Sequence, residues 1–236
     1  MDRARKPGSG GSALAAAWRV LDMRNILFVV ATLFAVAGPL GATEPQTRDE
    51  ALRALGQPDA RARRDAASRL GEIGTMDDAR ALVRALRDSD EGTRESAERA
   101  LWQIWARSGD EATDRLYAAG IHQMEEGELR EGIATFTRII EKKPEFAEAW
   151  NKRATLYFMV GELRKSLADC DEVMKRNPWH FGALAGYTQI YIQLEYYERA
   201  LEYARRALEV NPNMEGVRRN LMLLEHVQQQ RRQKMI

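Results

Sequence analysis

Apolar residues in the carboxyl-terminal half of the chain recur at helical spacing, in paired segments. The first segment of one pair has its apolar stripe at Trp150, Ala154, Tyr157 and Phe158. The second has its stripe at Leu163, Leu167, Cys170, Val173 and Met174. Steps of three and four residues place side chains on one face of an α-helix. The pattern therefore predicts two amphipathic helices that pack against each other through their apolar faces.

This paired pattern repeats every 34 residues. Pro144, Pro178 and Pro212 are separated by that interval, and Gly-Glu-Leu-Arg occurs at 127–130 and again at 161–164. Thirty-four residues accommodate two antiparallel helices with short turns, and the proline ends the second helix because its ring cannot continue the hydrogen-bond ladder. Within 109–214 the period predicts three units, followed by an amphipathic capping helix: 113–146, 147–180, 181–214 and then 215–236.

The repeated residues resemble the tetratricopeptide repeat family, whose pattern combines a large apolar residue, a small residue, a tyrosine, an alanine, an aromatic residue and a terminal proline. The matching residues are Leu116, Gly120, Phe136, Pro144, Trp150, Ala154, Tyr157, Pro178, Leu184, Tyr191, Ala200, Ala207 and Pro212. Arg153 and Cys170 depart from the pattern. A guanidinium on an apolar stripe needs a partner, and we expect a structural ion pair with Asp169 or a nearby glutamate. The resemblance implies an all-α fold, a right-handed superhelical solenoid of helical hairpins.

A second repeat, with a period of 31 residues, precedes the first. Its two copies are Asp59, Arg63, Ala66, Leu70, Ile73 and Asp90, Arg94, Ala97, Leu101, Ile104. Between them Thr75 and Asp78 form a helix-start pattern, which predicts a helix over 76–87. Residues 43–108 resemble short HEAT-like repeats, including the version first named for phycobilisome lyases, in which the Asp and Arg would join neighbouring units. The alternative is a set of helices docked on the first 34-residue unit, and both interpretations predict one continuous solenoid.

An uncharged run of twelve residues, 26–37, follows Arg24 and ends at Gly38 and Pro39. This layout is typical of a secretory signal, with a cleavage site near residue 42, and Met23 is a possible true start. A membrane-spanning helix needs about 20 apolar residues. We therefore expect a periplasmic protein with no stable membrane anchor. The alternative is an inner-membrane protein anchored by uncleaved residues 26–42.

The composition and the spacing of reactive residues disfavour several classes of function. Lys plus Arg number 36 and Asp plus Glu 35, a balance that does not favour nucleic acid as a partner. His122, His180 and His226 are far apart, and none has a Cys or His at metal-ligand spacing. Cys170 is the only cysteine and falls on an apolar stripe, where a thiol behaves as a small hydrophobe. We expect no metal, no cofactor and no catalytic activity.

The resemblance also implies where a partner would bind, because in this family the first helix of each pair lines a concave groove. The positions that it assigns to the groove are Tyr117, Ile121, Met124, Glu125, Asn151, Thr155, Phe158, Met159, Gln189, Ile192 and Gln193. This mixture of apolar side chains and amides suits an extended or helical peptide. The lysine and asparagine clamp that some members use for a terminal carboxylate is absent, and Phe158 and Ile192 could instead belong to the core.

The sequence thus predicts a non-catalytic interaction scaffold of the bacterial cell envelope, a monomer or weak homo-oligomer that binds a protein or peptide. Two alternatives stay open: an assembly factor of the cell wall or outer membrane that binds glycan, and a lyase-type enzyme subunit.

Overall fold

The computed structural model describes residues 44–234, and among them the regular secondary structure is entirely helical. The predicted signal segment, 1–42, lies outside the described residues. Within the described part, no helix combines the length and the hydropathy needed to cross a membrane.

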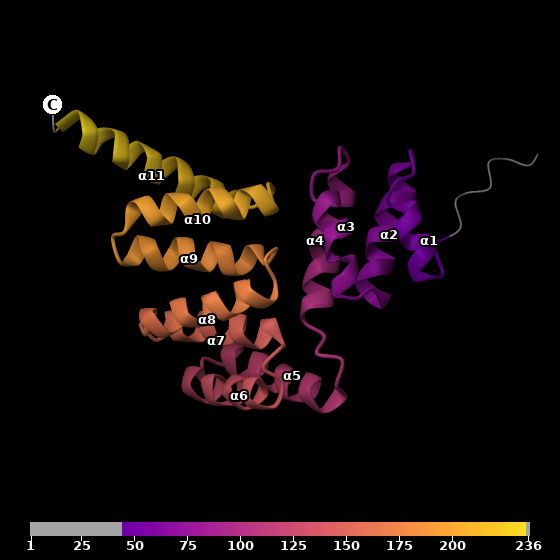
Figure 1. The fold of residues 1–236 in the computed structure, drawn as a ribbon, viewed down its shortest axis with the longest axis horizontal. Coiled ribbons are helices and arrows are strands. Elements are labelled where there is room, and N and C mark those ends of the chain that lie inside the picture. The colour runs from indigo at the N-terminus through magenta and orange to yellow at the C-terminus, as the bar shows by residue number, and fades with distance from the viewer. Residues whose placement is uncertain (1–43, 235–236) are drawn as a thin grey trace, which may run out of the picture. The chain divides into compact units, whose positions relative to one another are not determined.

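The amino-terminal helices are α1 (Arg48–Ala54), α2 (Ala60–Ile73), the short 3₁₀ helix η1 (Met76–Asp78), α3 (Ala79–Ala85) and α4 (Glu91–Trp105). Six helices then form three hairpins: α5 (Glu111–Glu125) with α6 (Leu129–Lys142), α7 (Ala147–Met159) with α8 (Leu163–Arg176), and α9 (Phe181–Gln193) with α10 (Tyr197–Val210). The last helix, α11 (Glu215–Lys234), packs on α10 (Figure 1). The predicted fold class, an all-α superhelix of helical hairpins, is confirmed.

The turn inside each hairpin requires a left-handed backbone at equivalent positions 34 residues apart. Gly127 and Gly161 occupy it with φ of 78° and 79°. Glu195 occupies it in the third hairpin with φ of 60°. A side chain with a Cβ disfavours this conformation, so the third turn is strained relative to the first two.

Close packing inside the hairpins depends on small residues opposite large ones. A Cβ on Gly120 of α5 would lie 2.8 Å from the ring of Phe136 on α6, so only glycine allows this approach. Phe136 and Leu156 are completely buried in the core that joins the first two hairpins. These contacts hold α6 against α7, and the stack continues from there.

In the amino-terminal segment, the two repeated aspartates begin helices. The Asp59 and Asp90 carboxylates accept hydrogen bonds from the backbone N–H groups of Ala62 and Thr93, which caps α2 and α4. We expected Asp and Arg of this repeat to join neighbouring units. The arginine does so, because Arg63 makes a two-point ion pair with Asp88 in the turn before α4, at 2.7 and 2.8 Å. Both aspartates satisfy N–H groups that a helix start leaves unpaired. Asp90 also joins the two copies, because its carboxylate lies 3.4 Å from Arg64 Nε of α2. Arg94 instead donates to the carbonyls of Asp88 and Ser89 in the turn before its own helix.

The expectation of one continuous solenoid was wrong for the step from α4 to α5. A continuous stack would place α4 on α5, whereas α4 packs against the third hairpin, and it runs beside the ends of α9 and α10 (Figure 1). Trp102 and Trp105 of α4 contact the ring of Phe181, with centroids 5.2 and 5.0 Å apart. Trp105 and Phe181 are buried and Trp102 partly buried in this contact, so burial of large apolar rings favours the packing of α4 on α9.

Polar contacts extend the same junction to the turn after α10. The Arg87 guanidinium donates to the backbone carbonyls of Glu209 and Val210, and Asn213 Nδ2 donates to the carbonyl of Leu86 at 2.8 Å. The alternative, in which these helices dock on the first 34-residue unit, was therefore wrong about the hairpin, because α4 packs against the third one. The predicted domain boundaries stay predictions. The observed helices α1 to α4 fall within 43–108, and the three hairpins fall within 109–214.

Candidate functional site

An apolar pocket of about 160 Å³ lies between α7 and α9, the first helices of the second and third hairpins. Four of the residues predicted for the groove line it: Asn151, Thr155, Phe158 and Gln189. The rest of its wall comes from Ala154, Ser166, Cys170, Gly182, Gly186 and Ile190. The structure thus brings together predicted positions from two repeats in one hollow, which we call the α7–α9 pocket.

The hydroxyl and amide groups of this pocket differ in their availability to a ligand. The Ser166 hydroxyl donates to the carbonyl of Ala154 at 2.7 Å, and the Thr155 hydroxyl donates to the carbonyl of Asn151 at 3.0 Å. Asn151 Nδ2 donates to Glu148 at 3.2 Å, whereas the Gln189 side chain is exposed. The interior is therefore internally hydrogen-bonded and apolar toward a ligand, and the Gln189 amide can bond to one at the rim.

The pocket exists because α9 carries glycines where it faces α7 and α8. A Cβ built on Gly186 would meet only Cys170 Sγ, at 3.6 Å, which is ordinary van der Waals contact. A Cβ at Gly186, which lines the pocket, therefore fits without a clash. Gly182 differs, since its Cβ would lie 2.5 Å from the Trp102 ring.

Cys170 lies at the base of the pocket as a packed thiol. Its side chain is 2% exposed, and burial, together with the neighbouring carboxylates of Asp169 and Asp171, raises its pKa to about 12. A thiol with this pKa stays protonated at neutral pH and is a poor nucleophile. Within the described residues, no group of three His, Cys, Asp or Glu side chains could hold a metal ion.

The predicted groove residues of the first hairpin do not join this pocket. Tyr117, Ile121 and Met124 pack against the core around Phe136, and the Tyr117 ring stands edge-on to that of Phe136 at 5.8 Å. Glu125 is exposed. The prediction that they bind a partner stays untested.

The remaining predicted residues, Met159, Ile192 and Gln193, do not line this pocket. Met159 is 49% exposed and Gln193 is exposed, whereas Ile192 packs against the core of the third hairpin, as does Phe158. Phe158 and Ile192 were the two positions for which the sequence left a core role open.

The predicted ion pair of Arg153 is confirmed. Its guanidinium binds both oxygens of Asp169, at 2.7 and 2.8 Å, and donates to Thr137 Oγ1 at 3.0 Å. It also covers the ring of Trp150, with 5.0 Å between the guanidinium carbon and the ring centroid. All these partners belong to the second hairpin or to α6, so Arg153 joins neighbouring hairpins.

The sequence did not reveal a buried pair of ionisable residues next to the pocket. His180 is 0% exposed and Glu148 1%, and His180 Nε2 lies 2.7 Å from Glu148 Oε2. His180 Nδ1 accepts the backbone N–H of Ala183, which caps α9, so the ring proton lies on Nε2 and is donated to Glu148. Lys152 Nζ binds the other Glu148 oxygen at 3.0 Å.

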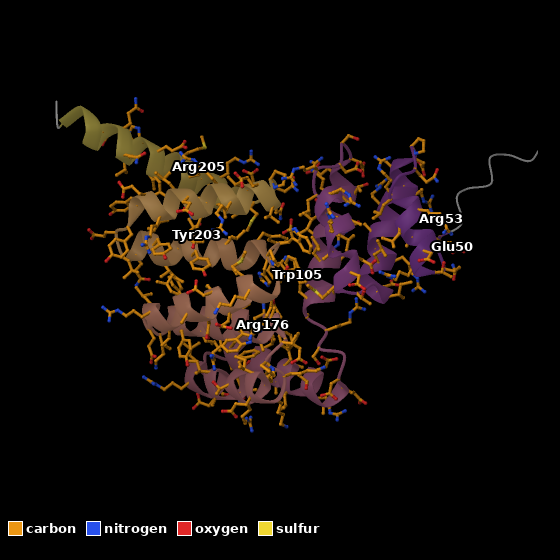
Figure 2. The ribbon with its side chains drawn as sticks, in the orientation of Figure 1. Glu50, Arg53, Trp105, Arg176, Tyr203 and Arg205 are labelled. Atoms are coloured by element: carbon orange, nitrogen blue, oxygen red, sulfur yellow. The ribbon has the colours of Figure 1, made fainter. Side chains whose placement is uncertain are left out.

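This pair lies directly under the junction with α4. The Trp105 ring stacks on the His180 ring, with centroids 4.5 Å apart. Figure 2 labels Trp105 where the amino-terminal helices meet the hairpins (Figure 2). Periodicity could not mark Glu148 as buried, because this residue lies off the apolar stripe at Trp150, Ala154, Tyr157 and Phe158.

The geometry defines the class of the chain as a helical-hairpin repeat protein. Residues 187–214 match the family model of the tetratricopeptide repeat, and residues 30–102 match that of HEAT repeats, whose first part precedes the described residues. These matches support a tetratricopeptide-repeat family for the hairpin segment, with a HEAT-like segment on its amino-terminal side.

A TPR repeat-containing protein of Rhizobium etli is 33% identical to the chain over 108 residues. The match covers 46% of this chain and 53% of the relative, so it spans about half of the relative's length.

Among solved structures, the Sgt2 TPR domain from Aspergillus fumigatus aligns with a TM-score of 0.50 at 18% identity, covering 52% of this chain and 83% of that one. At this identity the likeness concerns the fold alone. The first TPR of Spaghetti (RPAP3), bound to the HSP90 peptide SRMEEVD, aligns with a TM-score of 0.48 at 21% identity, covering 49% of this chain and 91% of that one.

Proposed function

We propose that this chain is a non-catalytic protein-interaction scaffold of the bacterial cell envelope, and that the α7–α9 pocket receives one apolar side chain of a peptide segment in a partner protein. The observation that carries the proposal is the pocket itself, which is apolar inside and has an exposed amide, Gln189, at its rim. Recognition of peptides commonly combines apolar anchors with a few hydrogen bonds to the peptide backbone.

The size of the pocket supports a side chain as its occupant. Its volume of about 160 Å³ is below the roughly 300–1,000 Å³ of pockets that enclose drug-sized ligands and cofactors. A single leucine, methionine or phenylalanine side chain is the appropriate scale. The raised pKa of Cys170 supports the non-catalytic part of the proposal, because the only cysteine in the pocket stays a neutral thiol.

The test is to fill the pocket without harming the fold. Peptides selected from a random library on the wild-type chain would be measured by isothermal titration against Gly186→Leu. The substitution removes a helix-interior glycine, so stability should hold or rise, and the leucine side chain should occupy the pocket. We expect affinity to fall at least tenfold.

Gly216→Leu is the matched control, because Gly216 is also a helical glycine, is exposed and does not line the pocket. A Cβ at Gly216 would meet only a side-chain nitrogen of Arg219, at 4.0 Å. It should keep the wild-type affinity. Selected peptides that bind Gly186→Leu as tightly as wild type would refute the pocket as the peptide site.

The location in the envelope is a separate part of the proposal, supported by the apolar run 26–37. Fusing residues 1–60 to alkaline phosphatase, which is active only after export, should give active enzyme in bacterial cells. Activity no higher than that of a fusion lacking 1–42 would contradict export.

A further inference from the structure

One end of the α7–α9 pocket lies at Gly182, and Trp102 of α4 packs directly against this glycine. Gly182 is the lining residue closest to the start of α9. The position that its Cβ would occupy is 2.5 Å from Cη2 and 3.3 Å from Cζ2 of Trp102, which are atoms of the six-membered ring of the indole. Because glycine has no side chain, none stands between that ring and the space that Gly182 lines. We call this end of the pocket its α4 end.

A contact on α7 places the same indole between the two helices that form the pocket. Lys152 Nζ lies 5.7 Å from the centroid of the Trp102 ring, and the residue before it, Asn151, lines the pocket. The other lining residues lie further along, up to Phe158 on α7 and Ile190 on α9. The amino-terminal segment therefore supplies a side chain at the end of the pocket where α7 and α9 begin.

Aromatic contacts hold this indole in place. It stands edge-on to three rings, those of Trp105, His180 and Phe181, with centroids 5.2, 5.5 and 5.2 Å apart. These three side chains are buried, whereas Trp102 is partly buried. Moving the indole aside would sacrifice all three edge-to-face contacts, each of which is favourable beyond the burial of area. The α4 end of the pocket is therefore a firm boundary.

We propose that Trp102 is a specificity-determining residue of the α7–α9 pocket. Its indole closes the α4 end, so the pocket accepts a side chain the size of leucine, methionine or phenylalanine and excludes the larger side chain of tryptophan. This inference rests on the proposed peptide-binding function of the pocket. Closely packed interiors do not take up extra ring atoms without displacing a neighbour. The helices on the amino-terminal side thus help to select the ligand of the hairpins.

Two peptides that differ only at the anchor residue test the proposal. One is a peptide selected on the wild-type chain with leucine as its anchor, and the other carries tryptophan there. In isothermal titration with the full chain, the tryptophan peptide should bind at least about tenfold more weakly, the scale on which an apolar pocket discriminates by size. Trp102→Ala removes the indole. It should strengthen the tryptophan peptide at least about tenfold and change the leucine peptide by less than about threefold.

Further variants separate the closed end from the stability of the fold. Trp102→Phe keeps a ring in the aromatic cluster and lacks the atoms nearest Gly182, so it should shift the preference in the same direction by a smaller factor. Trp105→Phe is the matched control. The Trp105 ring contacts Trp102, His180 and Phe181, none of which lines the pocket, so this variant should keep the wild-type preference. Circular dichroism of each variant checks that it is folded.

The route of the tryptophan anchor is tested by filling the pocket. If the anchor reaches the vacated space through the pocket, Gly186→Leu combined with Trp102→Ala should abolish the gain. A gain that persists in this double variant would overturn the role of Trp102, and so would an unchanged ratio of the two affinities in Trp102→Ala and Trp102→Phe, or equal ratios in Trp102→Phe and Trp105→Phe. Wild-type affinity of the leucine peptide for Gly186→Leu alone would instead remove the proposed peptide site, and this inference with it.

Discussion

Replacing Glu148 by alanine should destabilise the protein more than a typical single substitution does. The Glu148 carboxylate accepts from His180 Nε2 at 2.7 Å and from Asn151 Nδ2 at 3.2 Å, and both donors are buried. Each would be left without an acceptor, at about 1–3 kcal/mol. Lys152, whose side chain is 23% exposed, can turn to water and adds little. The sum is about 2–6 kcal/mol.

Urea denaturation followed by circular dichroism and tryptophan fluorescence measures this loss. With an m-value of about 2 kcal/mol/M, a 4 kcal/mol loss lowers the urea midpoint by about 2 M. Glu145→Ala is the matched control, because Glu145 is exposed on the turn just before α7, and it should change stability by no more than about 0.5 kcal/mol.

A double-mutant cycle tests the cause of the loss. If Glu148 and His180 stabilise the fold through each other, His180→Ala combined with Glu148→Ala should cost at least about 1 kcal/mol less than the sum of the single losses. A Glu148→Ala loss below about 1 kcal/mol, or additive single losses, would refute the reasoning.

Three further predictions concern local features of the fold. Glu195→Gly should raise stability by about 1 kcal/mol, because φ of 60° suits glycine; an unchanged urea midpoint would contradict the strain. Gly120→Ala should lower stability by about 1–3 kcal/mol, because its Cβ would lie 2.8 Å from Phe136, and Gly120→Ala combined with Phe136→Leu should recover part of the loss. The ion pair with Arg63 lowers the pKa of Asp88, so the pair stabilises the fold above the unfolded pKa of about 4, and this stabilisation is lost as pH falls through the lower folded pKa. Asp88→Asn should therefore reduce the fall of the urea midpoint with pH below about pH 4. Wild-type and Asp88→Asn midpoints that fall in parallel would count against this prediction.

The sequence predicted those features that depend on residues one repeat apart or closer. The period of 34 residues located the hairpins. Four of the residues predicted for the groove, Asn151, Thr155, Phe158 and Gln189, line one pocket, and their role in binding stays a prediction. The pair of Arg153 with Asp169 followed from the cost of leaving a guanidinium unpaired on an apolar stripe.

The packing of α4 on the third hairpin could not be predicted in the same way. Periodicity indicates which neighbouring units of a repeat touch. Nothing in the sequence around Trp102 and Trp105 indicates that they contact Phe181, which lies two hairpins further along the chain. In the first hairpin the predicted groove residues do not join the pocket, and their role in binding stays a prediction. Tyr117, Ile121 and Met124 are partly buried and pack against the core around Phe136.

The contacts of Arg87 and Leu86 with residues 209–213 change how the protein responds to mechanical load. In a linear repeat array each unit touches only its neighbours, so a pulling force can extend the superhelix gradually. Here the segment between residues 87 and 209 is clamped at both ends, and it cannot lengthen until that clamp breaks. When the chain is pulled between residues 48 and 210, the force–extension curve should therefore show one rupture event, from the contacts of Arg87 and Leu86, before any hairpin unfolds.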